Sequence, residues 1–450
     1  MADAASILPG RERALAEVDL DAVRHNVRRL MRDLPPGAAH CAVVKANGYG
    51  HGAVPVARAA LEAGSTWLGV ATVTEAEELR AAGLGLAGHG VAGHGAAGPG
   101  VAGHDSLAPG APILIFGPMT GAELERAVQA GADVVVWSAA FARAARRLGA
   151  RCHVKFDSGM GRLGVSEAEA RELAALVASG PSRLVGLMSH FATADEADTT
   201  FFHYQLGRFT ALATAMKDAY PGLLCHTANS AATLRSPASH FDMVRTGIAL
   251  YGLAPANDDP SRDGLCPAMR LSSYVAGIRA VAPGESVGYG RRFIAEAPAR
   301  FAIVPAGYAD GIARALTNRG DVLVAGRRCR IAGTISMDQL TVLLPDGHGR
   351  PGDEVVFFGE ARAEPWARRA GDDSGTADDS APTGGGPVER ILCEEVAQLL
   401  GTINYEVVCD VPPRGGGGGG RGPPPPPPAG GKVRGGEAAA NDDAAAHPRP

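Results

Sequence analysis

Short apolar runs rich in Val, Ile and Leu alternate with segments of helical period along the first half of the chain. Eight such runs, each a candidate strand, lie at 40–45, 67–72, 112–117, 133–138, 151–157, 184–191, 223–228 and 241–246. Apolar residues nearly fill several of them, which is typical of parallel strands covered on both faces. Eight strands alternating with helices over about 240 residues predict an α/β fold, a (β/α)8 TIM barrel, and leave an open doubly wound sheet as the alternative.

Helix starts between these strands are predicted from capping boxes, in which Ser or Thr is followed three residues later by Glu. Thr74 with Glu77 and Ser166 with Glu169 fit this pattern. Before the first strand, an apolar stripe at helical spacing over 20–30 predicts a further helix.

Changes in composition mark the domain boundaries. The barrel is expected over 12–255, with a flexible inserted loop at about 86–107 in which VAGH is repeated. From 256 to 412 short apolar strands predict a mainly-β domain, with a disordered Asp/Gly/Ser/Pro-rich insert at about 361–387. The Gly/Pro-rich tail, 413–450, cannot bury a core and is expected to be disordered.

Charge and cysteine content argue against several classes of protein. The net charge of −5 gives no sign of binding to nucleic acid or an anionic membrane, and no apolar run approaches the length of a membrane span. The seven cysteines are scattered, without a CxxC pair or metal-ligand spacing, so reduced thiols and no metal site are expected. The N-terminus lacks the apolar core of a signal peptide, and we therefore expect a cytoplasmic protein.

Polar residues fall where the active site of a barrel is expected, at the C-terminal ends of the strands. The candidates that fall there are Lys45, Arg162, His190, Asn229, Ser230, Arg245, Gly247 and Ile248. A lone charged residue at a strand end is usually just exposed to solvent and has no catalytic role. These candidates come from several strands of one barrel, so we expect them to converge on one pocket.

The chemistry of these residues predicts a cofactor. Barrels often seat a phosphate in the loops after strands seven and eight, where Ser230 offers a hydroxyl and Gly247 lets backbone N–H groups come close. A lysine in a pocket can bind a carbonyl compound covalently or move a proton. Lys45 opposite a phosphate seat, with Arg245 facing a ring nitrogen, predicts pyridoxal 5′-phosphate.

A known family is indicated by a series of motifs. In chain order they are VKANGYGHG, KFDSGMGRLG, HFATADE, HTANSAATLR, DMVRTGIALYG, VGYGRRF, GYADG, ISMDQ and TINYEVVC. As a set they resemble the motifs of alanine racemase, the fold-type III pyridoxal phosphate enzymes. The resemblance runs from about residue 12 to 409, apart from the two inserts, with Gly48 where the family usually has alanine.

The resemblance implies catalytic roles. Lys45 would hold the cofactor and act as one base, and Tyr289 in VGYGRRF would act as the other. Arg245 would bind the pyridine nitrogen, and His190 would act on Tyr289 through the network of that arginine. Arg162 would support the phenolic oxygen of the cofactor.

The resemblance also implies binding surfaces. Beside Asn229, the phosphate would be held by Tyr49, Ser230, Gly247 and Ile248. The substrate would lie near Arg162, Met337 and Asp338, and the entryway would include Asp195, Tyr308 and Asp310. Lys155 matches a lysine that is carbamylated in many members and steadies Arg162.

Two bases suit the reaction that the resemblance implies. Racemisation removes the Cα proton from one face and returns a proton to the other, so bases on opposite faces need not move. Burial lowers the pKa of a lysine, and a nearby cation lowers that of a tyrosine. In the family the β domain reaches the pocket of a neighbouring subunit. The resemblance thus implies a homodimer with shared sites that acts on alanine and supplies D-alanine for peptidoglycan.

Other functions remain open at this point. A serine or broader-specificity racemase needs only a slightly larger pocket, a same-fold decarboxylase would use a cysteine of the second domain, and a non-catalytic pyridoxal phosphate-binding protein would be a lone barrel. GMGRLG at 159–164 fits the GxGxxG fingerprint of a dehydrogenase, but the helix cap Ser166 follows the glycines. No tyrosine follows Tyr405, although the family carries one in a C-terminal segment that gates the entry.

Overall fold

The computed structural model describes residues 12–84, 110–362 and 387–412. The loop expected at 86–107, the tail expected at 413–450 and most of the insert expected at 361–387 lie outside this range. Within the described residues, no helix combines the length and apolarity needed to cross a bilayer.

Eight parallel strands form one sheet in the order β8-β7-β6-β5-β4-β3-β2-β9. Their bounds are β2 (Ala39–Val43), β3 (Trp67–Val70), β4 (Ile113–Ile115), β5 (Asp133–Val136), β6 (Arg151–Lys155), β7 (Arg183–Met188), β8 (Leu224–His226) and β9 (Met243–Thr246). The two ends of the sheet meet, because Asp242 N donates to Cys225 O (3.0 Å) and Arg245 N donates to Ala228 O (3.0 Å). The barrel predicted from eight apolar runs is confirmed, and the open doubly wound sheet is wrong.

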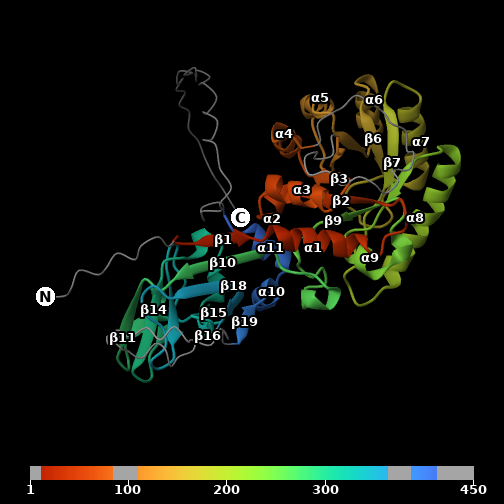
Figure 1. Ribbon diagram of the computed structural model, residues 1–450. Helices are drawn as coiled ribbons and strands as arrows, with labels where there is room; N and C mark the ends of the chain where they lie inside the picture. Colours follow the sequence, from red (N-terminus) through yellow and green to blue (C-terminus); the bar gives the residue numbers. More distant parts are fainter. Residues whose placement is uncertain (1–11, 85–109, 363–386, 413–450) are drawn as a thin grey trace, which may run out of the picture. The chain divides into compact units, whose positions relative to one another are not determined.

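Helices surround the barrel strands (Figure 1). Their bounds are α1 (Leu20–Met31), α2 (Lys45–Tyr49), α3 (Ala53–Glu62), α4 (Val73–Ala81), α5 (Gly121–Gln129), α6 (Ala139–Arg147), α7 (Glu167–Ala178), α8 (Thr200–Ala219) and α9 (Ser230–Arg235), with 3-10 turns η1 (Pro237–Ser239), η2 (Ile248–Tyr251) and η3 (Pro260–Asp263). The capping box at Ser166 is confirmed. The one expected at Thr74 and Glu77 is wrong, because α4 is capped two residues earlier by Thr72 and Glu75.

A compact apolar cluster fills the inside of the barrel. It takes residues from seven of the eight strands: Cys41, Trp67, Leu114, Val135, Val185, Met188, Leu224 and Met243. Side chains from strands on opposite sides can touch only across the interior. The remaining strand, β6, contributes His153, whose ring meets Trp67 edge-on at 5.6 Å between ring centroids. The interior of this barrel therefore combines apolar packing with buried polar groups.

The second domain is mainly β, as predicted. One antiparallel sheet runs β1 (Leu15–Val18), β10 (Met269–Tyr274), β18 (Glu354–Arg362), β15 (Asp321–Val324) and β16 (Arg327–Arg330), with β19 (Val388–Ile391) paired to β18. Smaller sheets join β11 (Gly277–Val281), β14 (Ala299–Val304) and β17 (Leu340–Leu344), and β12 (Ser286–Val287) with β13 (Phe293–Ile294). The helical pieces are η4 (Tyr289–Arg291), η5 (Tyr308–Asp310), η6 (Arg314–Leu316), α10 (Cys393–Leu400) and α11 (Asn404–Cys409).

Two details differ from the expected boundaries. Strand β1 lies within the range assigned to the barrel, yet it pairs with β10 of the second domain, Leu15 opposite Ser272. Ala361 and Arg362 were expected in a disordered insert, but they end β18 and pair with β19. Both differences arise from pairing between distant segments, which local composition does not encode.

Candidate active site

Lys45 lies two residues after the end of β2 and begins a left-handed turn. The φ angles of Ala46, Asn47, Gly48 and Tyr49 are 52°, 52°, 63° and 51°. Left-handed backbone costs about 1–2 kcal/mol for each residue with a side chain, so this turn persists only because its surroundings hold it. Such strain is typical of functional sites, where it places a side chain that ordinary backbone would direct elsewhere.

Two side chains hold this turn in place. Glu75 of α4 accepts from Ala46 N through Oε1 (2.6 Å), while its Oε2 accepts from Ala71 N (2.7 Å). Asn47 Oδ1 accepts from Ala53 N at the start of α3 (3.1 Å). The turn is thereby tied to the helices on either side of it.

The wall beside the turn is aromatic. The Tyr49 and Tyr251 rings lie 5.0 Å apart between centroids, and the Tyr251 hydroxyl donates to Val43 O (2.9 Å). Tyr405 of α11 lies 6.0 Å from the Tyr49 ring. Gly50 permits the close approach of α11, because a Cβ there would lie 2.3 Å from Val408 O.

The Lys45 amine is largely buried, with Nζ 5.9 Å from the centroid of the Tyr49 ring. Burial lowers the pKa of this amine, and the positive charge of Arg162 lowers it further. More of the amine is therefore neutral at a given pH, which is the form that acts as a nucleophile or a base.

Arg245 is buried at the end of β9 and fixed by hydrogen bonds. Its Nη1 donates to His226 Nδ1 (2.8 Å), and its Nη2 donates to Ser189 O (2.8 Å), Thr227 O (3.3 Å) and His190 Nδ1 (3.3 Å). Burial lowers its pKa to about 10, so it remains a cation at neutral pH. Its Nε has no acceptor among the described residues.

Several cations gather around His190. Burial lowers the pKa of His190 well below its usual value, and Lys155, Arg245, Arg162 and Lys45 lower it further. This histidine is therefore neutral. Lys155 is also buried, and its pKa lies well below the ordinary lysine value because of burial and of Arg245 and Arg162. The positive field favours an anionic ligand.

An anion seat lies in the loops after β8 and β9. Ser230 Oγ accepts from Gly247 N (3.0 Å) and Ala249 N (3.3 Å), so backbone N–H groups point at one spot. A Cβ on Gly247 would lie 2.4 Å from the Tyr49 hydroxyl oxygen, so only glycine leaves room there. Buried Ile248 follows, at the start of η2. Asn229 caps α9, because its Oδ1 accepts from Ala232 N (3.0 Å). The hydroxyl groups of Ser230 and Tyr49 beside these backbone N–H groups fit the phosphate of pyridoxal phosphate.

The glycines of the GMGRLG stretch bind a carboxylate of their own loop. Gly159 N, Met160 N and Gly161 N donate to Asp157 Oδ1 at 2.9, 2.7 and 3.2 Å. They are satisfied within the loop and do not open a helix, because α7 starts after Ser166. The dinucleotide fingerprint is therefore a chance match. Arg162 is exposed at the end of this loop.

Four of the remaining predicted residues, Tyr289, Tyr308, Met337 and Asp338, lie on the second domain and are exposed, whereas Asp310 there is buried and Asp195 is exposed in the loop after β7 of the barrel. The exposed fractions of Tyr289, Met337 and Tyr308 are 73%, 53% and 43%. Backbone contacts bring their loops together, because Thr334 Oγ1 donates to Tyr289 O (2.6 Å) and Tyr308 N donates to Ser336 O (3.1 Å). We call Tyr289, Tyr308, Met337 and Asp338 the exposed edge. Within the described residues of one chain, no contact joins Tyr289 to Lys45.

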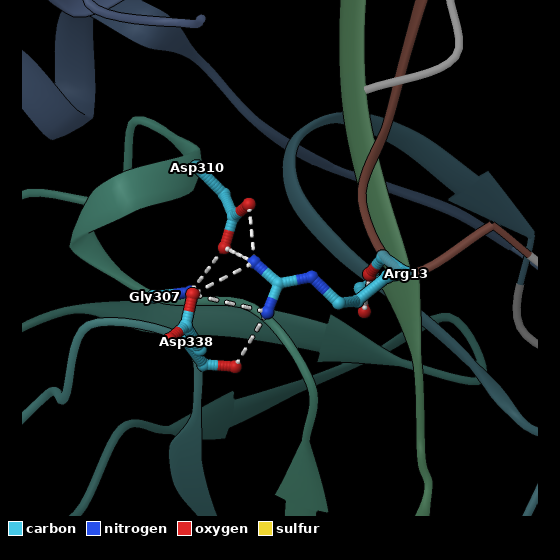
Figure 2. A network of polar contacts seen from close by, with 5 residues as sticks. Arg13, Gly307, Asp310 and Asp338 are labelled. Atoms are coloured by element: carbon cyan, nitrogen blue, oxygen red, sulfur yellow. Dashed lines mark hydrogen bonds and ion pairs between the residues drawn. The ribbon is translucent and has the colours of Figure 1, made fainter. Parts of the chain in front are cut away.

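Arg13 links Asp338 of the exposed edge to the buried Asp310 (Figure 2). Its Nη2 donates to both oxygens of Asp310 (2.6 and 2.5 Å), and its Nη1 donates to Asp338 O (3.2 Å). Asp310 Oδ2 also accepts from Gly307 N (2.9 Å). Arg13 lies 325 residues before Asp338 in the chain. No local sequence signal points to this residue, and the sequence analysis missed it.

Two sequence models match most of the chain. Residues 18–255 match the model described as "Alanine racemase, N-terminal domain", and residues 268–387 match "Alanine racemase, C-terminal domain". The chain belongs to the alanine racemase family. It is therefore an isomerase, and the match to the second domain argues against the lone-barrel binding protein.

Curated relatives and solved structures agree with the alanine racemase family. The chain is 41% identical to the alanine racemase of Frankia casuarinae over 413 residues, covering 89% of this chain and 95% of the relative. The crystal structure of the Streptomyces lavendulae enzyme superposes with a TM-score of 0.73 at 39% identity, covering 90% of this chain and 96% of that one. The Bacillus anthracis enzyme, described with bound L-Ala-P, gives 0.72 at 34% identity, with coverage of 90% and 94%.

Some residues that shape this racemase site were missed by the sequence analysis. Glu75 was overlooked because the helix start was assigned two residues too late. His226 lies within the motif HTANSAATLR but had been given no role. Cys409 lies near enough to Lys45 to affect its pKa, and burial raises the pKa of the Cys409 thiol. The match of both domains to alanine racemase, and not the state of this thiol, argues against a same-fold decarboxylase.

Proposed function

We propose that this isomerase interconverts L- and D-alanine by a two-base mechanism, with pyridoxal 5′-phosphate held at Lys45 and with Lys45 and Tyr289 as the bases. The observation that carries the proposal is the lowered pKa of a largely buried Lys45 amine beside a cationic pocket and an anion seat, in a chain of the alanine racemase family.

Pyridoxal phosphate, when bound, supplies an electron-withdrawing ring that stabilises negative charge at the substrate Cα. Ser230, Gly247, Ile248 and the Tyr49 hydroxyl would hold its phosphate. Arg245 would donate to its ring nitrogen. A guanidinium has no lone pair that could accept a proton, so Arg245 can only donate there.

The two bases divide the proton transfers between them. A neutral Lys45 amine can accept the Cα proton on one face, and Tyr289 can return a proton on the other. A tyrosine placed near Arg162 and Arg245 would ionise more readily, because nearby cations lower a phenol pKa. Arg162 and the backbone N–H of Met337 would orient the substrate carboxylate, with Asp338 beside them.

A second copy of the chain would complete each site. Tyr289 is 73% exposed and the exposed edge carries two further large apolar side chains. Exposed apolar groups gathered on one surface are typical of an interface. The exposed edge of one subunit would enter the pocket of its partner, so the homodimer is required for catalysis.

Alanine is the proposed substrate on the strength of the relatives, and D-alanine for peptidoglycan is the proposed product. The Bacillus anthracis enzyme is described with bound L-Ala-P and the Clostridium difficile enzyme in complex with cycloserine, both small ligands. Parallel assays with L-alanine and L-serine distinguish a narrow alanine pocket from a broader-specificity or serine racemase.

Mixing two inactive variants tests the shared site. Lys45→Ala and Tyr289→Phe proteins should each be inactive alone. After subunit exchange, half of the dimers are mixed and each has one intact site, so about a quarter of wild-type racemisation should return. D-alanine formation by chiral chromatography measures this recovery.

Two control proteins accompany the mixing experiment. Tyr204→Phe changes another exposed tyrosine, on α8, and should retain full activity. Lys45→Ala mixed with the Lys45→Ala/Tyr289→Phe double variant should stay inactive. An active isolated subunit, or no recovery on mixing despite verified exchange, contradicts the shared site.

A further inference from the structure

A chain of hydrogen bonds runs through the inside of the barrel from Arg245 to Asp133. Arg245 Nη1 contacts His226 Nδ1 (2.8 Å), His226 Nε2 contacts His153 Nδ1 (2.8 Å), and His153 Nε2 contacts Asp133 Oδ2 (3.1 Å). Asp133 and both histidines have no solvent exposure, and Arg245 is only 4% exposed. The mechanism proposed above uses only Arg245 of these four residues.

The two ends of this chain determine where every proton lies. A guanidinium can only donate, so His226 Nδ1 must accept from Arg245. Burial lowers the pKa of His226 far below its usual value, so this ring is neutral and carries its single proton on Nε2. That proton points at His153 Nδ1, which must accept, and His153 therefore donates from Nε2 to Asp133.

Asp133 is suited to end the chain. Burial alone would raise its pKa, but the hydrogen bonds from His153 and Arg151 outweigh burial and hold the pKa below its usual value. An ionised carboxylate only accepts hydrogen bonds. Arg151 Nε donates to Asp133 Oδ1 (2.6 Å) and its side chain is 35% exposed.

The carboxylate lies at the far end of the barrel from the site. Asp133 and Arg151 are the first residues of β5 and β6 and pair directly with each other, whereas Arg245 lies near the end of β9. In a parallel barrel these positions are at opposite ends. This series of hydrogen bonds thus connects the N-terminal face of the barrel to Arg245 at the candidate active site.

We propose that Asp133 is a positioning residue that fixes the protons of His153 and His226, so that Arg245 keeps its acceptor and presents its free N–H to the cofactor ring. The proposal rests on the proposed function for the role of Arg245. Without the charge of Asp133, His153 can carry its proton on Nδ1, where it meets the Nε2 proton of His226. Two facing donors cannot bond, and Arg245 then loses its partner inside a buried site.

Asp133→Asn tests this role, because asparagine keeps the shape and removes the charge. Histidine-selective ¹⁵N NMR reads the position of each imidazole proton without the cofactor. In the wild type, His153 and His226 should both show the Nε2–H form, and in Asp133→Asn a second form should appear at both. Cofactor binding should become about ten-fold weaker and kcat about ten-fold lower, with KM for alanine changed far less.

Asp242→Asn is the matched control. Asp242 also lies at the start of a barrel strand, just before β9, and pairs with a cation, Lys217, at 2.6 Å, but it contacts none of the histidines of the chain. Its imidazole spectrum and its kcat should match those of the wild type. Arg151→Gln keeps the Asp133 carboxylate and should retain the Nε2–H forms.

Several results would overturn the proposal. The first is an Nδ1–H form of either histidine in the wild-type protein, a measurement that does not depend on a variant folding correctly. Unchanged imidazole protons in a folded Asp133→Asn is another, and altered protons with unchanged kcat and cofactor affinity is a third. If the wild type did not racemise alanine, the proposed function would be wrong. The imidazole spectrum would still decide whether the protons of His153 and His226 lie where we propose.

Discussion

The Lys45 amine is held where its charged form is costly. It is largely buried, and Arg162 adds a second positive charge to its surroundings. Its position at the end of a buried strand could be predicted from the sequence, because the apolar run before it is local. Its environment could be predicted only in part: Arg162 was expected in the same pocket, whereas Glu75 and Cys409 reach Lys45 and its turn from other elements of the chain and were missed.

The reactivity of Lys45 should follow its lowered pKa. The rate at which the apoenzyme takes up pyridoxal phosphate should rise with pH as the amine loses its proton, and then reach a plateau. The midpoint of this rise should lie below 10.5, the ordinary pKa of a lysine. Stopped-flow absorbance at several pH values measures this midpoint. Removing the neighbouring charge in Arg162→Gln should move the midpoint upward.

A control for this shift is Arg171→Gln, which removes an exposed arginine paired with Glu167 on α7. It should leave the midpoint unchanged. An Arg162→Gln midpoint equal to that of the wild type would show that Arg162 does not act on Lys45.

At the scale of elements, the left-handed turn after β2 depends on α4. The sequence contains two overlapping capping boxes, Thr72 with Glu75 and Thr74 with Glu77, and sequence alone does not choose between them. In the structure Glu75 caps α4 and holds the turn, whereas Glu77 binds Arg126 of α5 (2.8 Å). The eight barrel strands were predictable because their apolar runs are local, but this choice depends on packing between helices.

Glu75→Gln should loosen the turn. A glutamine has one acceptor oxygen and no charge, so all three backbone N–H groups that Glu75 now serves lose a charged partner, and at least one of them faces the amide NH2 instead of an acceptor. We expect a loss of about 1–3 kcal/mol in the free energy of unfolding and weaker cofactor binding. Urea denaturation and absorbance titration measure the two effects.

Glu123→Gln provides the comparison, because Glu123 forms the same capping box with Thr120 and its hydrogen bonds go only to Thr120. It should lose some stability and retain cofactor affinity. Equal effects of both substitutions on cofactor binding would mean that Glu75 acts only as a cap.

At the scale of the whole molecule, the second domain depends on the N-terminus of the chain. Strand β1 forms the edge of its main sheet, and Arg13 just before β1 holds the buried Asp310 and Asp338 of the exposed edge. The mainly-β character was predictable from short apolar strands. The role of residues 13–18 was not, because it arises from pairing with segments that lie far away in the sequence.

Arg13→Gln should disorder the exposed edge. The Arg13 side chain is 40% exposed, but the Asp310 carboxylate is only 3% exposed, and without its cation this buried charge would be left unpaired, which is destabilising. We expect a fall of about ten-fold or more in racemase activity, with a smaller loss of barrel stability. Activity assays and sedimentation measurements of dimer formation check both.

Arg270→Gln is the matched change. Arg270 also links β1 to the same sheet, through Glu17 at 2.7 Å, but does not reach the exposed edge. It should weaken the sheet while leaving the rate per dimer near that of the wild type. An Arg13→Gln protein with wild-type rate and dimer affinity would remove Arg13 from this role.

The pairing of β1 with β10 also sets an order of events during synthesis. Leu15 emerges early from the ribosome, yet its partner Ser272 is made much later. At ordinary elongation speeds the first strand waits roughly 10 to 50 seconds for that partner. The nascent barrel can close in this interval, and the earliest residues translated become among the last to take their final place.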